Sequence, residues 1–178
     1  MNAFSKILTA AVLVAGVGAP AFAQASDSES TTGSVRIIQP IALTKVTDLA
    51  FGTIVRPASG SSVITMSTTS NTPTVDTGTA VIVAGGSKTR ASYTVTGEGG
   101  QTIAITVPAS FVMNDGGSNN ITVNLVSEAA TDTLTGSIGS TGNFSGDGTL
   151  YVGGNFTISN STVSGNYSGS FSTTVAYN

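Results

Sequence analysis

The sequence contains no cysteine, no histidine and no tryptophan among its 178 residues. Without cysteine there can be no disulfide, no thiol nucleophile and no cysteine-bound metal cluster. Without histidine the chain has no Ser-His-Asp triad, no imidazole acid or base and no histidine-ligated zinc site. The stability of the folded protein therefore has to come from its core.

Charged residues are also scarce, at 8% of the chain, against about 25% in a typical soluble domain. Six lysines and arginines stand against nine aspartates and glutamates, so the chain has no basic surface for phosphate backbones. Nucleic acid is not expected as a partner. An enzyme would have to rely on carboxylates, lysine or tyrosine, and we expect a protein that is not an enzyme and has no cofactor.

The first 23 residues have the three parts of an export signal. Lys6 gives the positive start, residues 7–17 form an apolar run, and residues 21–23 (Ala-Phe-Ala) are a small-x-small cleavage pattern. We predict cleavage between Ala23 and Gln24, and export to the periplasm, the cell surface or the medium. No second apolar run of membrane-spanning length follows, so no transmembrane segment is expected in the mature chain.

The predicted mature chain divides into an arm and one domain. Residues 24–34 contain no apolar anchor, which is typical of a flexible segment. Residues 35–178 consist of short apolar or alternating segments separated by turns rich in glycine, asparagine and aspartate. Clear alternation is seen for Ile103, Ile105 and Val107, and again for Ile121, Val123 and Leu125. A period of two predicts half-buried strands.

Many short strands joined by glycine-rich turns, with no sustained helical stripe, predict an all-β fold: an antiparallel β-sandwich of the immunoglobulin or pilin kind. We expect residues 97–100 and 114–119 to form hairpin loops, and residues 153–155 (Gly-Gly-Asn) to mark a further turn. Residues 81–83 (Val-Ile-Val) are apolar on both faces and are interpreted as a central strand. Phe51, beside Gly52, is interpreted as a core aromatic.

Three stretches of the chain carry a family resemblance. The first is PIALTKVTDLAFGTI at residues 40–54. The second is ASYTVTGE followed by TIAITVP, and the third is LYVGG with the closing GNYSGSFSTTVAY at residues 165–177. In this order they resemble the bacterial family of domain of unknown function 4402, a group of small exported proteins. The resemblance implies a fold and a location, and no catalytic residues.

The closing stretch is also similar to the last strand of fimbrial subunits assembled by chaperone and usher, which often end in alternating apolar residues with a penultimate tyrosine. Tyr167, Phe171, Val175 and Tyr177 share one face if this stretch is one continuous strand. Those subunits commonly carry a disulfide, which this chain cannot form. We interpret the four residues as a candidate assembly strand, whose free edge would accept a strand from another copy or from a sibling subunit.

The segment that another copy would donate is short. The arm has no alternating apolar residues, so only residues 35–41, with Val35 and Ile37, would bury apolar surface. The same segment also fits the first strand of its own domain, and the sequence favours this second interpretation.

Two functions fit the sequence. The first is a structural or adhesive, fimbria-like surface subunit that assembles through sheet edges. The alternative is a monomeric periplasmic or secreted binding module with a ligand site on its loops. A secreted hydrolase would need two facing carboxylates, and no such pair is visible in the spacing of Glu98, Asp115, Glu128, Asp132 and Asp147.

Calcium is the small ligand that the sequence suits best. Asp115, with Asn114 and Asn119, offers the hard oxygen donors that calcium prefers. The run Asn-Asp-Gly-Gly is primarily turn chemistry, however, and it lacks the spacing of a dedicated calcium loop. We therefore assign no metal site.

Overall fold

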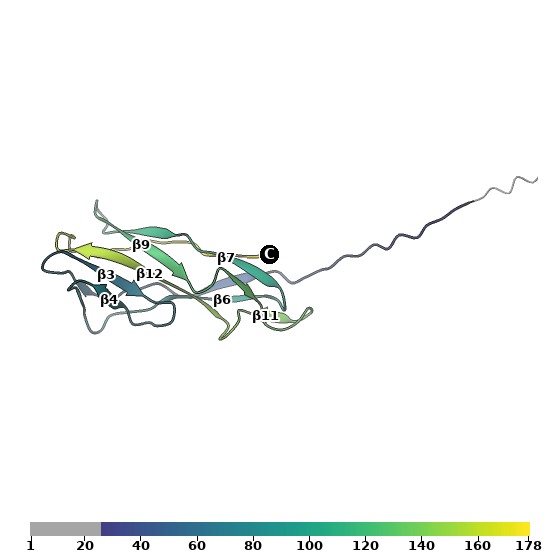
Figure 1. Cartoon of the computed structure of the whole chain (residues 1–178), viewed down its shortest axis with the longest axis horizontal. Helices are drawn as coiled ribbons and strands as arrows, with labels where there is room; N and C mark the ends of the chain where they lie inside the picture. Colours follow the sequence, from purple (N-terminus) through teal and green to yellow (C-terminus); the bar gives the residue numbers. More distant parts are fainter. Residues whose placement is uncertain (1–25) are drawn as a thin grey trace, which may run out of the picture. The chain divides into compact units, whose positions relative to one another are not determined.

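The computed structural model describes residues 26–178, so the predicted cleavage site between Ala23 and Gln24 lies outside the described residues. Residues 26–178 form strands and turns and contain no helix, which confirms the all-β prediction. No helix that could cross a membrane is therefore found in this part of the chain. The chain divides into two units between Val35 and Arg36, and all strands found among residues 26–178 lie in the second unit (Figure 1).

Thirteen strands are present between residues 26 and 178. In chain order they are β1 (Ala42–Thr47), β2 (Ile54–Val55), β3 (Ser61–Met66), β4 (Thr74–Thr77), β5 (Val81–Ile82), β6 (Ala91–Glu98), β7 (Thr102–Thr106), β8 (Ser110–Asn114), β9 (Asn120–Ser127), β10 (Thr131–Thr133), β11 (Thr141–Asn143), β12 (Thr149–Ser159) and β13 (Thr174–Tyr177).

These strands form two main antiparallel sheets and one small ribbon. The larger sheet has the order β1-β6-β12-β3-β4, with β9 and then β8 added beside β12, and with β11 beside the end of β6. The smaller sheet has the order β10-β7-β13. Figure 1 shows β9, β12 and β3 running side by side at the centre of the larger sheet.

Side chains from both main sheets meet in one core cluster. Ile103 and Ile105 of β7 pack with Tyr93 and Val95 of β6 and with Leu150 of β12. The smaller sheet therefore covers part of the larger one, which is the sandwich-like arrangement that the alternation predicts. The predicted inward face of β7 is confirmed, because Ile103 and Ile105 are both buried.

A second core cluster surrounds two phenylalanine rings. Phe51 and Phe156 meet edge to face with their ring centroids 4.8 Å apart, a favoured arrangement of aromatic side chains. Phe51 is 7% exposed, so its predicted place in the core is confirmed. Gly52 follows with a φ of 79°, a left-handed conformation that glycine adopts without strain.

The longest strand, β12, contains a feature that the sequence analysis placed wrongly. Gly153 and Gly154 were predicted to mark a turn, but both are buried inside β12. A side chain on Gly153 would collide with the carbonyl oxygen of Met66. A Cβ atom on Gly154 would lie 2.6 Å from the carbonyl oxygen of Asn124. The glycines are needed because β3 and β9 approach β12 closely on its two edges.

Of the two predicted hairpin loops, one is confirmed. Residues 114–119 join β8 and β9, which pair antiparallel. Residues 97 and 98 end β6 and residues 99 and 100 form a turn, but this is not a hairpin loop, because β6 belongs to the larger sheet and β7 to the smaller one. This connection carries the chain from one layer to the other. Alternation reports where a strand lies, but it does not report the strand's partner.

Two further strand assignments were wrong. β5, predicted as a central strand, pairs only with the two-residue β2, and its Val81 is 56% exposed. An apolar run on both faces therefore did not mean burial here. Residues 35–41, interpreted as the first strand of their own domain, lie in no strand, because β1 begins at Ala42. Val35 and Ile37 are each 85% exposed.

Candidate functional site

The C-terminal strand is shorter than the alternation predicts. Val175 and Tyr177 lie in β13, whereas Tyr167 and Phe171 precede it. Val175 and Tyr177, which were predicted to share one face, both pack against the core cluster shared by the two sheets. The candidate assembly strand therefore contains two of the four residues proposed for it.

The stretch before β13 lies along β8 instead. Asn114 of β8 and Ser168 exchange two backbone hydrogen bonds, at 2.8 and 3.0 Å. A side chain on Gly169 would collide with the carbonyl oxygen of Val112. The other two residues of the candidate assembly strand make contacts of their own. The Tyr167 hydroxyl donates to the carbonyl oxygen of Val163 at 2.8 Å, and the ring centroids of Phe171 and Phe111 lie 5.1 Å apart. Close backbone contact with β8 thus keeps this stretch out of the smaller sheet.

β13 forms an edge of the smaller sheet. It pairs with β7, and with no other strand between residues 26 and 178. The N–H of Asn178 donates to the carbonyl oxygen of Thr102 at 3.0 Å. Since bonded and non-bonded positions alternate along an antiparallel ladder, Ala176 also bonds to β7, and the backbone groups of Val175 and Tyr177 point outward. Such outward groups form a template for another strand.

Other edge strands carry features that oppose such pairing. β1 has a bulge that leaves Val46 unpaired, and its Lys45 forms an ion pair of 2.6 Å with Asp48. β4 contains Asp76, and β10 contains Asp132. Charges and bulges on an edge discourage the addition of a foreign strand. β8 and β11 also lack charge and bulges, but Ser168 bonds to Asn114 of β8 and Thr135 bonds to Asn143 of β11. β13 has no charge, no proline and no bulge, and although β1 lies nearby, no strand among residues 26–178 pairs with its outer edge, which is therefore open.

Tyr177 also fixes β13 to the rest of the domain. Its hydroxyl donates to the carbonyl oxygen of Gln39 at 2.9 Å and accepts the N–H of Glu98 at 2.6 Å. Glu98 is 2% exposed, and its carboxylate accepts the N–H groups of Gly139 and Gln39. These bonds, first from Gly139 and then from Gln39, hold the pKa of Glu98 below its usual range.

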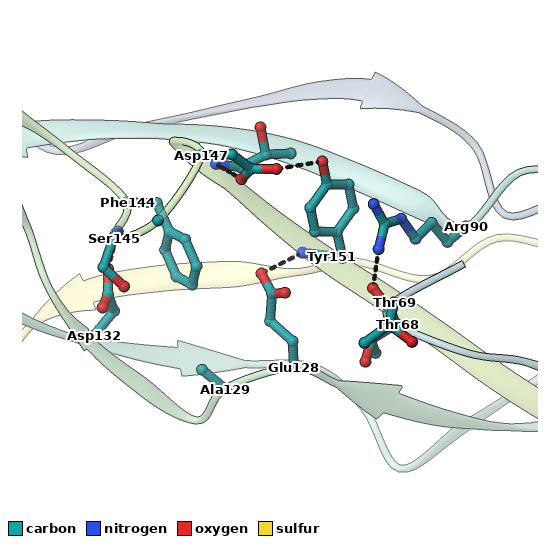
Figure 2. Close-up of a pocket in the computed structure, with 12 residues that line it drawn as sticks. Thr68, Thr69, Arg90, Glu128, Ala129, Asp132, Phe144, Ser145, Asp147 and Tyr151 are labelled. Carbon is teal, nitrogen blue, oxygen red and sulfur yellow. Dashed lines mark hydrogen bonds between the residues drawn. The ribbon is translucent and has the colours of Figure 1, made fainter. Parts of the chain in front are cut away.

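A second candidate site is a polar cleft of about 600 Å³ that lies beside the start of β12 (Figure 2). Its walls come from the loop before β12, from the connection between β9 and β10, and from the segments next to β3 and β6. The charged groups that line it are Arg90, Glu128, Asp132 and Asp147. The sequence analysis did not bring these residues together.

Tyr151 organises this cleft. Its hydroxyl donates to Asp147 Oδ2 and its backbone N–H donates to Glu128 Oε1, both at 2.8 Å. Arg90 Cζ lies 3.3 Å from the centroid of the Tyr151 ring, a cation–π contact, and its guanidinium donates to the carbonyl oxygen of Thr68 (Figure 2). One tyrosine therefore positions two carboxylates and one guanidinium.

The carboxyl groups of the cleft are shifted in opposite directions. Burial raises the pKa of Glu128, while the hydrogen bond from the Tyr151 hydroxyl lowers the pKa of Asp147. Asp132 accepts the N–H of Ser145 at 2.7 Å. Within residues 26–178, no three acidic side chains lie close enough together to hold a metal ion. Ionised carboxylate oxygens act only as hydrogen-bond acceptors, so those in the cleft can accept from hydroxyl or ammonium groups.

Asp115, which the sequence analysis considered as a calcium ligand, stabilises its own loop. Its carboxylate accepts the side-chain N–H of Asn119 at 2.6 Å and the backbone N–H of Gly117 at 2.9 Å. These bonds, first that from the Asn119 side chain, lower the pKa of Asp115. The run Asn-Asp-Gly-Gly is used for turn chemistry in the β8–β9 hairpin.

The fold and these sites define an all-β protein with a sandwich-like pair of antiparallel sheets, one of which ends in an open edge. The chain belongs to the family of domain of unknown function 4402, whose sequence profile matches residues 41–177. Comparisons with curated proteins and with solved structures find no match. The family resemblance is thus confirmed, and the fimbrial resemblance of the last strand stays a prediction.

Proposed function

We propose that this protein is an exported, non-catalytic surface protein, structural or adhesive, whose copies assemble by adding a strand to β13. The open edge of β13 is the observation that carries this proposal. Val175 and Tyr177 direct their backbone groups outward, and no charge or bulge opposes a partner strand. Strand addition takes its affinity from main-chain hydrogen bonds and its specificity from alternate side chains.

The segment before β1, taken from a second copy, is the occupant that fits this edge. Val35 and Ile37 alternate along the chain, are each 85% exposed and lie in no strand. Paired with β13, they would lie on the same face as Val175 and Tyr177, which pack against the core. Burial of these two apolar side chains would favour this register between the donated segment and β13 over a register shifted by one residue, which would turn both side chains to the outer face.

The absence of catalysis belongs to the same proposal. Asp147 accepts hydrogen bonds from the Tyr151 hydroxyl and from the N–H of Thr149, and Asp132 accepts the N–H of Ser145. Carboxylates engaged in this way hold loops in place. We therefore propose structural roles for them.

The first test places charge on the edge. Thr174→Lys with Ala176→Lys changes two exposed side chains of β13, and Thr131→Lys with Thr133→Lys is the matched control on β10, the opposite edge of the same sheet. In light scattering of chains that begin at Gln24, we expect polymers from the wild type and from the control, and monomers from the β13 variant. A wild type that stays monomeric at high concentration would sink the proposal.

The second test identifies the donated segment. Because the chain has no cysteine, each introduced cysteine is unique. Arg36→Cys and Ala176→Cys occupy the outer face in the expected register, so an oxidised mixture of the two variants should give a cross-linked heterodimer. Lys45→Cys, on the edge of β1, replaces Ala176→Cys as the control. Equal cross-linking to both positions would show that the segment has no preference for β13.

The polar cleft favours a second candidate function, a monomeric binding module for a sugar or another hydroxyl-rich surface molecule. Its carboxylates would accept hydrogen bonds from ligand hydroxyl groups. Glycan-array binding by the wild type, reduced in both Glu128→Gln and Asp147→Asn, would support this function. Binding that both variants retain would place the ligand elsewhere.

A further inference from the structure

Gln39 is held by its own domain through three hydrogen bonds. Its N–H donates to Glu98 Oε2 at 3.1 Å, and its carbonyl oxygen accepts the Tyr177 hydroxyl at 2.9 Å. Its side-chain oxygen accepts the Thr141 hydroxyl at 3.1 Å. Pro40 follows directly, and its ring fixes φ. We refer to Gln39, Glu98, Thr141 and Tyr177 together as the Gln39 clamp.

The surroundings of the clamp leave it little freedom. Glu98 is 2% exposed, and its second oxygen accepts the N–H of Gly139. The Tyr177 hydroxyl is used twice, because it also accepts the N–H of Glu98. A side chain on Gly97 would collide with that hydroxyl oxygen. Gln39 and Tyr177 are half-buried and Thr141 is exposed, so the rigidity of the clamp rests on the buried Glu98 and on the hydrogen bonds that converge on Gln39.

Tyr177 belongs to two structures at once. It is part of β13, the edge that would receive the segment of another copy, and part of the clamp that holds Gln39. The segment proposed for donation, residues 35–38, runs directly into Gln39. In each copy, Tyr177 therefore connects the edge that would accept a strand with the segment that would be donated. No linker separates residues 35–38 from the clamp.

We infer that the Gln39 clamp makes the assembly stiff, so that each copy fixes the orientation of the next; this inference rests on the proposed function. Flexible linkers uncouple the domains that they join, whereas a segment that passes at once into a rigid network transmits orientation. The predicted partner is thus a second copy in a defined orientation, and the predicted product is a stiff fibre.

Fibre stiffness tests the inference. Insertion of Gly-Ser-Gly-Ser between Ile38 and Gln39 adds a linker and leaves the clamp intact, whereas Tyr177→Phe removes its central hydroxyl. Tyr167→Phe is the matched control, because that hydroxyl bonds to Val163 outside the clamp. In negative-stain images we expect persistence length to fall by about twofold or more in the insertion and in Tyr177→Phe, as flexible linkers imply, and to stay unchanged in the control. Wild-type stiffness in both altered chains would overturn the inference.

A measurement on the monomer separates failure of the clamp from failure of the proposed function. If the wild type forms no polymers, the proposed function fails, but the amide of Gln39 still reports the clamp by hydrogen exchange. We expect this amide to exchange much more slowly than that of Ile37, and Tyr177→Phe to accelerate it. A Gln39 amide that exchanges as fast as the Ile37 amide would show that there is no clamp, whatever the assembly state.

Discussion

In this protein, tyrosine hydroxyl groups and backbone N–H groups form hydrogen bonds that fix the positions of several polar and charged residues. A phenol both donates and accepts, so Tyr177 joins Gln39 and Glu98 through one oxygen atom. Tyr151 uses its hydroxyl for Asp147 and its backbone for Glu128. The carboxylates of Glu98, Glu128 and Asp147 all accept hydrogen bonds from neutral groups, whereas Asp48 forms an ion pair with Lys45. The pH dependence of stability should follow from these bonds.

Glu128→Gln should make the folded protein slightly more stable at neutral pH. Burial raises the pKa of Glu128, so the folded state holds this proton more tightly than the unfolded state, and wild-type stability falls as pH rises through its titration. The gain should be less than about 1 kcal/mol, because the side chain is more than one-third exposed and solvent screens it. Urea unfolding of variant and wild type at neutral and acid pH measures it.

Asp147→Asn is the natural counterpart of that variant. The pKa of Asp147 is lowered, so its ionised form contributes stability above its unfolded pKa, and this contribution is lost as pH falls through its titration. The variant should therefore be less stable than the wild type at neutral pH and should lose this difference in acid. Changes of the same sign in both variants would contradict the assignment of the two shifts.

At the scale of elements, β12 decides the arrangement of the larger sheet. Its residues 149–152 pair with β6, its residues 154–159 pair with β3, and β9 pairs with residues 152–156. Gly153 and Gly154 lie where the partner changes from β6 to β3. The absence of side chains lets the neighbouring backbones approach, so these glycines are structural in a strand and not residues of a turn.

Gly153→Ala should destabilise the domain by about 1–3 kcal/mol, the usual cost of overpacking a core. The added methyl group would meet the carbonyl oxygen of Met66, a backbone atom that cannot turn away. Gly33→Ala is the control, because a methyl group there has open space around it. Urea denaturation compares the two free energies of unfolding, and equal values would mean that β3 moves freely away from β12.

At the scale of the whole molecule, the edge strands differ in how they are protected, even within the smaller sheet, where β10 and β13 are the two edges. β1, β4 and β10 are marked by a bulge or by charge, whereas β13 is not. In the proposed assembly, the open edge of β13 would be the acceptor of each copy and the exposed alternating segment before β1 its donor. Contacts between unlike surfaces of this kind produce open chains when the rotation between copies does not close a ring.

Export is the prediction that concerns the chain as a whole. The positive start, the apolar run and the pattern ending at Ala23 predict a mature protein that begins at Gln24. The intact mass of the protein recovered from its native host should equal that of residues 24–178. A mass that includes residues 1–23 would contradict both the export and the surface function that depends on it.

The sequence by itself determined several of the strands and turns, because both depend largely on local properties of the chain. Alternation placed Ile103 and Ile105 in the core, and asparagine, aspartate and glycine chemistry placed the loop at 114–119. The sequence also showed a tyrosine one residue from the end. What it did not contain was a signal for the hydroxyl partners of Tyr177, since Gln39 and Glu98 lie far away along the chain.

Tertiary structure alone decided which strands pair and which side chains meet. Residues 97–100 cross between sheets, and Glu128 meets Tyr151 only because β9 lies antiparallel to β12. Likewise, the edge of β13 is open because no strand among residues 26–178 pairs with its outer side, a fact that its four residues cannot encode. Pairing depends on closing long loops between distant segments, and the period of two within a strand carries no information about its partner.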